Sequence, residues 1–288
     1  MKNIIKDLIL DEERALYNLK DTEVVNVKFS GEADGESALK EIRNCDILDS
    51  YFNLRYPLWH AQGFNVQNSE FTPLSRAPIW YANNGFIKNT KIYGTKSVRE
   101  CHNLILEDCD INSDEFGWKC NYIKLNDSNI ESSYLFFGSN NISVDNIEMK
   151  GKYSFQYINN LKITNSELRT KDAFWHSENV YIKDSVIYGE YLGWFSKNLT
   201  LENCVISSTQ PLCYCENLKI INCYMDACDL AFEYSTVDAT ILGDIESIKN
   251  PKAGTIICDS VEEIILDDSI YESKAKIIER DKQDEKLA

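Results

Sequence analysis

The chain has 288 residues, of which 43% are hydrophobic, so it is long enough to bury a sizeable core. Its 46 acidic and 30 basic residues give a net charge of −16, which argues against nucleic acid and anionic membranes as partners. No apolar run reaches the roughly 18 residues of a membrane span, and the N-terminal segment lacks the features of a signal peptide. We therefore expect a cytoplasmic protein.

Ten cysteines occur, and in a cytoplasmic chain of this length we expect reduced, buried thiols rather than disulfides. The only close spacings are Cys213 to Cys215 and Cys223 to Cys228, and neither matches half of a zinc motif. The sequence therefore predicts no metal site and no cofactor.

A repeat organises the chain. Its motif is an aliphatic residue two positions before an Asn or Asp anchor, usually a small residue directly after the anchor, and an aliphatic residue three positions after it. The anchor recurs every 19 residues from Asn89 to Asn222. Earlier, less regular copies place anchors at Asn26, Asn44 and Asn68. A second Asn column lies five residues before many of the anchors.

Alternating aliphatic or small residues in segments of about five predict half-buried strands. Each copy has room for three short strands, which stack on their counterparts in neighbouring copies. The sequence thus predicts an all-β, right-handed parallel β-helix of about 12 coils with three sheets. The Asn columns fit its turns, because Asn tolerates the left-handed conformation and stacked Asn side chains hydrogen-bond from coil to coil. A leucine-rich repeat fits less well, since its period is longer and includes a helix.

The expected domain organisation follows from where the repeat is regular. We expect a single β-helix domain over residues 1–271, regular between residues 86 and 235. Residues 1–12 are expected to cover one end of it, and residues 272–288 form a charged C-terminal tail.

All five Trp residues fall in one column, ten residues after the anchor in the regular copies: Trp59, Trp80, Trp118, Trp175 and Trp194. Strand alternation favours a core position for this column and turns the seventh, ninth and eleventh columns outward. A bend in the strand would instead turn the Trp column to solvent, where Arg99 and Gln156 of the same column fit better. Both orientations remain open.

In either orientation, one face of the β-helix carries aromatic rings together with carboxylates and a histidine. Such a surface suits an extended sugar chain. The expected ligand-binding residues are Trp118, Tyr134, Tyr153, Phe155, Gln156, Tyr157, Phe174, Trp175, Tyr191, Trp194, Phe195 and Tyr214. The simpler interpretation is that these aromatics only pack on the sheet.

Catalysis is a weaker hypothesis. If the protein is an enzyme, polysaccharide lyase or glycoside hydrolase activity is the expected type, because paired carboxylates or a base near cations would serve it. The candidates are Asp172, His176, Asp229, Glu233 and Lys119. An ion pair between Glu100 and Lys119 of neighbouring coils is the plainer interpretation for that lysine.

Several segments carry a family resemblance: "GESALKE" (35–41), "YPLWH" (56–60), "RAPIWY" (76–81), "KYSFQY" (152–157), "KDAFWH" (171–176), "GEYLGWFS" (189–196), "TQPLCY" (209–214), "CDLAFEYS" (228–235) and "SIKNPKAG" (247–254). Together they resemble an uncharacterised bacterial family with the pectate lyase-like right-handed β-helix fold. The resemblance implies that fold and carries over no catalytic residues. The aspartate signatures of the fold's hydrolases and lyases are not evident in this chain.

The leading functional hypothesis is carbohydrate binding or processing on the aromatic face, with an oligosaccharide as partner. The alternative is a non-enzymatic solenoid whose aromatic face mediates self-association, giving a homo-oligomer, or binds another protein.

Overall fold

The computed structural model describes residues 2–280 as a right-handed parallel β-helix of about 15 turns, with about 19 residues per turn. The expected 12 coils were too few, because the chain before Asn26 and the chain after Asn222 also form coils, although the motif is not evident there. The chain divides into two compact units, residues 1–148 and 149–288. The single domain expected over residues 1–271 stays a prediction.

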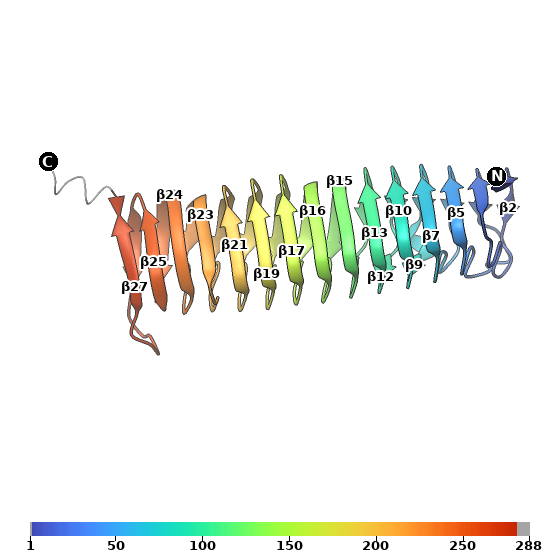
Figure 1. Ribbon diagram of the computed structural model, residues 1–288. Helices are drawn as coiled ribbons and strands as arrows, with labels where there is room; N and C mark the ends of the chain where they lie inside the picture. Colours follow the sequence, from blue (N-terminus) through green and yellow to red (C-terminus); the bar gives the residue numbers. More distant parts are fainter. Residues whose placement is uncertain (1, 281–288) are drawn as a thin grey trace. The chain divides into compact units, whose positions relative to one another are not determined.

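In the first unit most coils contribute a longer and a shorter strand, which are continuous in β15 (Asn121–Ser133) and β16 (Asn140–Lys152), and the strands pair in parallel with their counterparts in the neighbouring coil (Figure 1). The strands are β1 (Asn3–Lys6), β2 (Ile9–Leu10), β3 (Thr22–Val25), β4 (Lys28–Phe29), β5 (Arg43–Leu48), β6 (Tyr51–Phe52), β7 (Gln62–Gln67), β8 (Glu70–Phe71), β9 (Ile79–Trp80), β10 (Asn83–Lys88), β11 (Lys91–Ile92), β12 (Val98–Arg99), β13 (His102–Glu107), β14 (Asp110–Asn112), β15 and the beginning of β16. One 3₁₀ helix, η1 (Pro73–Ser75), lies between β8 and β9.

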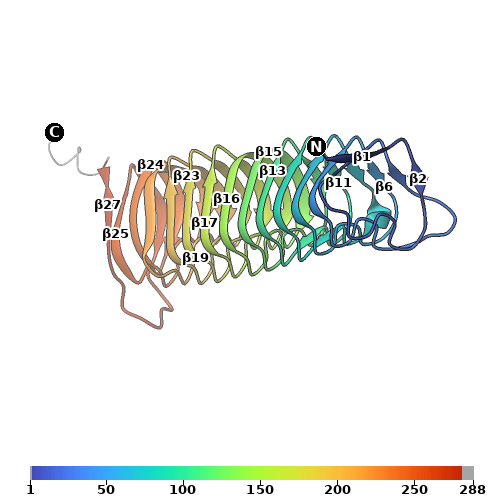
Figure 2. The same cartoon turned by 45° about the vertical axis from the view of Figure 1, so that its right-hand side comes forward.

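The second unit repeats this arrangement (Figure 2). Its strands are β17 (Asn159–Thr164), β18 (Glu167–Lys171), β19 (Glu178–Lys183), β20 (Val186–Glu190), β21 (Lys197–Glu202), β22 (Val205–Thr209), β23 (Leu218–Asp229), β24 (Thr236–Lys249), β25 (Ala253–Cys258), β26 (Val261–Ile265) and β27 (Lys274–Glu279). Its longer strands stack aliphatic residues on one another, as where Ile163 pairs with Ile182 and Val180 with Leu199.

The third side of most coils is a turn instead of the expected third sheet. In the coil after β18, alternate residues take the left-handed conformation, with φ of 51° at Asp172, 62° at Phe174 and 53° at His176. Coil-to-coil hydrogen bonds continue across this side, for example from Phe174 N to Ser154 O at 2.9 Å. Only β9 and β12 pair as strands of a separate sheet in the described chain. The strand alternation assumed from the sequence therefore fails here.

The anchors were assigned correctly except in one early coil. Asn26, Asn68 and the regular anchors all have positive φ. In β5, however, Leu48 pairs with Gln67, so the anchor that aligns with Asn68 is Asp49. Asn44 belongs instead to the second Asn column, five residues before the anchors. Both columns carry Asn, which explains the error.

Both expected end segments turn out to include strands. Residues expected to cover the first coil contain β1 and β2, whose Ile4 and Ile9 are exposed. At the other end, β27 lies in the expected charged tail and pairs with β25. The last residues of that tail, 281–288, lie outside the described residues.

Three further properties concern residues 2–280. All ten cysteines are buried free thiols, as predicted. No helix in this range is long and apolar enough to cross a membrane. No group of three or more His, Cys, Asp or Glu side chains is arranged there to hold a metal ion.

Candidate functional site

The Trp column of the first unit is a stack of flat groups on the third side of the coils. The ring centroids of Trp59 and Trp80 lie 5.1 Å apart with nearly parallel planes. The guanidinium of Arg99 lies 5.1 Å from the Trp80 ring and 5.3 Å from the Trp118 ring. Phe137 follows, 5.1 Å from Trp118. Arg99 therefore continues the stack as a cation between two indoles.

Each indole also donates a hydrogen bond to the next coil. In the second unit Trp175 Nε1 donates to Tyr191 O at 2.6 Å, and Trp194 Nε1 donates to Gln210 O at 2.7 Å. Gln156 Nε2 makes the equivalent bond to Asp172 O at 2.8 Å. The Trp rings are half-buried. The bend orientation is therefore the correct one: the Trp column lies at the solvent boundary, and the core position favoured from alternation was wrong.

Phe155 and Phe174 were expected to contact a ligand, and the structure contradicts this. Their exposed fractions are 0% and 2%, and their rings stack in the core at 5.3 Å. The physical reason is the left-handed conformation at alternate positions, which turns the ninth column inward.

The eleventh column forms the most exposed aromatic row of the second unit, which we call the ring column: Tyr157, His176, Phe195 and Tyr214. Successive centroids lie 5.0, 4.9 and 4.8 Å apart, with planes within 13° of parallel. Tyr157 is 54% exposed and Phe195 40%. Because each inner ring covers the faces of its neighbours, the column presents ring edges to solvent. Stacking of a sugar needs a ring face, so the column is a poor platform for it.

The other expected contacts lie at the surface, except Gln156. Trp118, Trp175 and Trp194 are half-buried, Tyr134 is exposed, and Tyr153 and Tyr191 are half-buried. Gln156 is buried, with its side-chain amide engaged by the backbone. Ligand binding by the surface members stays a prediction.

No hydrogen bond of the described chain joins Asp172 and His176, which are two of the catalytic candidates. Asp172 is 7% exposed, and burial raises the pKa of its carboxyl, assisted by the negative charge of Glu190 and opposed by Lys171. Lys171 Nζ lies 2.7 Å from Glu190 Oε2. His176 is a member of the ring column.

Asp229 and Glu233 do not have the positions expected for them. An irregularity between β22 and β23 adds one residue to this coil, so Thr209 pairs with Asp229. Tyr214 N therefore donates to Glu233 O, which puts Glu233 in the Trp column rather than the ring column. Glu233 Oε1 forms an ion pair with Lys249 at 3.0 Å, and Asp229 Oδ1 accepts a hydrogen bond from Gln210 N. Both carboxylates thus have structural partners.

The expected ion pair between Glu100 and Lys119 is absent from the described chain. Glu100 instead lies 3.7 Å from the neighbouring Arg99. Lys119 is exposed on the surface. None of the five catalytic candidates is brought together with another in a constellation for proton transfer.

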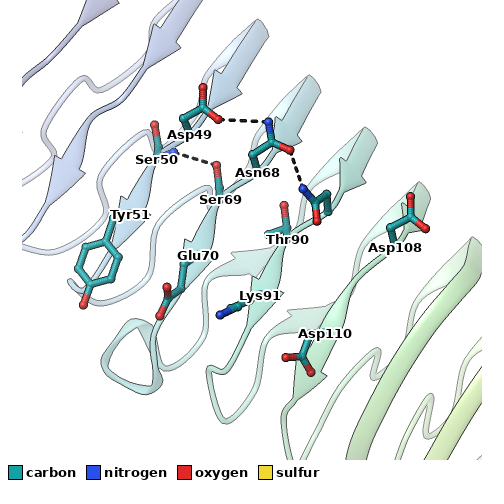
Figure 3. Close-up of a pocket in the computed structure, with 11 residues that line it drawn as sticks. Asp49, Ser50, Tyr51, Asn68, Ser69, Glu70, Thr90, Lys91, Asp108 and Asp110 are labelled. Carbon is teal, nitrogen blue, oxygen red and sulfur yellow. Dashed lines mark hydrogen bonds between the residues drawn. The ribbon is translucent and has the colours of Figure 1, made fainter.

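A groove of about 450 Å³ in the first unit, which we call the polar groove, crosses four coils (Figure 3). One wall is the anchor column, Asp49, Asn68, Asn89 and Asp108, and the floor is Ser50, Ser69 and Thr90. The other wall is formed by the residues two positions after each anchor, which are Tyr51, Glu70, Lys91 and Asp110. Each of the side chains that line the groove carries a hydroxyl, amide, ammonium or carboxylate group.

Hydrogen bonds hold the anchor wall and the floor in place. Asn68 Nδ2 donates to Asp49 Oδ1 at 3.1 Å, and Asn89 Nδ2 donates to Asn68 Oδ1 at 2.8 Å (Figure 3). The hydroxyls of Ser50, Ser69 and Thr90 donate to backbone carbonyls two residues earlier. This part of the groove is therefore a fixed array of polar groups.

The side chains of the opposite wall form fewer hydrogen bonds within the protein. Glu70 and Lys91 form no ion pair or side-chain hydrogen bond within residues 2–280. Asp110 accepts a hydrogen bond from the Tyr93 hydroxyl at 2.5 Å, and this bond raises the pKa of Tyr93 to about 12. Glu70 and Lys91 thus have hydrogen-bonding capacity to offer a ligand.

This groove was not predicted from the sequence. Its signal was a run of charged or hydroxyl residues two positions after successive anchors. Half of that run, Tyr51 and Glu70, lies before the regular copies, where the anchor of one coil had been misplaced by five residues.

The family model that matches this chain is described as a protein of unknown function (DUF3737), and it covers residues 3–279. The chain belongs to this family. No curated protein matches the sequence.

Three solved structures illustrate the similarity of fold. The surface adhesin PfbA of Streptococcus pneumoniae is 9% identical with a TM-score of 0.38, over 91% of this chain and 82% of that one. The tailspike protein of E. coli bacteriophage HK620, in complex with a hexasaccharide, is 11% identical with a TM-score of 0.44, over 92% of this chain and 60% of that one. Tailspike protein 3 of bacteriophage CBA120 is 11% identical with a TM-score of 0.32, over 96% of this chain and 51% of that one. This chain thus spans little more than half the length of the two tailspikes, and such low similarities carry no information on ligand or activity.

Proposed function

We propose that this protein binds a saccharide chain in the polar groove of its first unit. The observation that carries the proposal is the lining: two parallel walls of carboxylate, amide, hydroxyl and ammonium groups cross four coils. Sugar hydroxyls both donate and accept hydrogen bonds, so a mixed lining of this kind satisfies them where an apolar groove would not.

The repeat of the coils supports an elongated ligand. Neighbouring strands lie about 4.8 Å apart, and each coil presents the same columns again at that spacing. A chain of similar units can therefore meet similar groups at each step. Tyr51 supplies the one aromatic ring of the groove, at the coil of Asp49. A peptide strand is a poorer occupant, because the backbone edges of the strands beneath are already paired on both sides.

Binding without catalysis is the form of the proposal that the side chains support best. No hydrogen bond or ion pair of the described chain joins any two of the five catalytic candidates from the sequence, and none of them lines the groove. The ring column of the second unit supports the alternative, self-association, because its exposed ring edges form a contiguous apolar row.

The test is a binding screen against a panel of neutral and acidic oligosaccharides by isothermal titration calorimetry. We expect at least one to bind, and both Glu70→Gln and Tyr51→Ala to weaken it about tenfold, which corresponds to about 1.4 kcal/mol. Glu167→Gln is the matched control, since Glu167 occupies the same column in the second unit, outside the groove. It should leave the affinity unchanged.

Two results would contradict the proposal. One is binding that survives both groove substitutions. The other is no binding by any oligosaccharide, together with a dimer in sedimentation equilibrium that Phe195→Asp dissociates. The second result would support self-association through the ring column.

A further inference from the structure

A second hollow, of about 260 Å³, lies in the first unit beside the Trp column. Tyr56, Ala77 and Trp80 give it apolar surface, and Arg76, Thr95 and Lys96 give it polar surface. None of these six residues lines the polar groove. Its volume suits one ring-sized group rather than a chain.

Two of the six lining residues are cationic, although the chain carries a net charge of −16. Lys96 Nζ lies 3.2 Å from Glu115 Oε2, so its charge is shared. Arg76 forms no ion pair with any carboxylate among residues 2–280. A guanidinium without a carboxylate partner can bind an external one through two parallel hydrogen bonds.

The backbone at Arg76 is strained. Its φ of 54° and ψ of −76° are costly for a residue with a Cβ atom. The residue ends η1, in the coil from Asn68 to Asn89, which is two residues longer than the regular coil. Strain of this kind persists where the surrounding structure enforces it, and it is concentrated at ligand-binding positions. A turn with no other role would be more stable with Gly here.

We propose that this hollow binds a carboxylate carried on a single ring. Arg76 provides the main charge, Lys96 provides a second one, and Tyr56 and the edge of the Trp80 indole contact the ring. The site is separate from the polar groove and does not depend on saccharide binding there. A neutral ring lacks the charge that Arg76 requires, and a bare oxyanion lacks the ring that the aromatic wall requires.

The test is a titration followed by backbone amide chemical shifts at low ionic strength, with sodium glucuronate and sodium benzoate as the carboxylates. We expect at least one of them to bind with a Kd in the millimolar range or below, and glucose and inorganic phosphate to bind at least tenfold more weakly. Arg76→Gln should weaken the carboxylate at least tenfold. Lys162→Gln, which removes an exposed cation of the second unit that lines neither this hollow nor the polar groove, is the matched control and should change the Kd less than twofold.

A second variant separates loss of binding from loss of folding. Arg76→Gly accepts the positive φ, so we expect a higher midpoint of thermal unfolding together with loss of carboxylate binding. Millimolar binding that persists in Arg76→Gln would overturn the proposal. So would the absence of binding by both carboxylates, or phosphate binding as tightly as either of them. A failure here leaves the oligosaccharide result intact, because that experiment depends on Glu70 and Tyr51.

Discussion

Trp194→Phe tests whether the Trp column stabilises the fold through its indole hydrogen bonds. The ring centroids of Trp175 and Trp194 lie 5.3 Å apart, and the substitution keeps a ring that can stack on Trp175. It removes the 2.7 Å hydrogen bond from Trp194 Nε1 to Gln210 O. A lost hydrogen bond costs about 0.5–1.5 kcal/mol, and the smaller ring loses some packing. We therefore expect a total loss of about 1–2 kcal/mol in the free energy of unfolding.

The assay is urea unfolding followed by far-UV circular dichroism, which does not depend on Trp fluorescence. The m-value should stay constant if only stability changes. Tyr188→Phe is the matched control: it also removes one polar donor from an aromatic ring of the second unit, but the Tyr188 hydroxyl has no hydrogen-bond partner in the described chain. It should change stability by less than about 0.5 kcal/mol. If Trp194→Phe costs no more than this control, the hydrogen-bonded Trp column is not stabilising, and the reasoning is refuted.

Two further predictions concern buried titratable groups. Burial raises the pKa of Asp172, so the folded state binds this proton more tightly than the unfolded chain does. Ionisation of Asp172 therefore lowers the free energy of unfolding, and this loss grows as the pH rises above the ordinary carboxyl pKa. Asp172→Asn should stabilise the protein more at pH 7 than at pH 3 in urea titrations, and a gain that is the same at both pH values would contradict this. Burial also raises the pKa of Cys109 to about 11 and those of Cys213 and Cys215 to about 12. Iodoacetamide at pH 8 should leave these thiols unmodified in the native protein and label them in denaturant, as measured by mass spectrometry; native labelling at the rate of a free thiol would disprove it.

The repeat period predicted the coils well, because the residues around each anchor respond to simple physical demands. A residue between stacked coils must be small or aliphatic, and Ile163, Ile182 and Ser166 meet this demand in the core. The anchor needs a positive φ, for which Asn and Asp are the most tolerant residues with a side chain. At these positions the side chain itself therefore indicates the local structure.

The third side could not be predicted in this way. Alternation assumes an extended backbone, but Phe174 and His176 adopt the left-handed conformation, which neither side chain favours. Hydrogen bonds to neighbouring coils, such as Phe174 N to Ser154 O, compensate for this local cost. Because the compensation comes from another coil, residues 171–177 alone give no signal of it. The inward position of Phe174 and the outward position of Trp175 follow from that backbone.

The polar groove was hidden for a different reason. Glu70 and Lys91 look like ordinary surface charges in the sequence, and only the correct register brings them into one wall. An extra residue before Asp229 had a similar effect in the second unit, since it moved Glu233 into the Trp column and Tyr234 into line with Tyr214 of the ring column. A single insertion thus changes which residues share a surface while the strands stay in place.

The coil that contains η1 shows where this scaffold can change in length. Its two additional residues are absorbed between β8 and β9, yet β10 stays aligned with β7 and β11 stays aligned with β8. The strands on two sides thus set the register independently of the corner on the third. In an evolutionary sense, that corner is the place where new surface can be acquired without refolding the neighbours, and Arg76 lies in it.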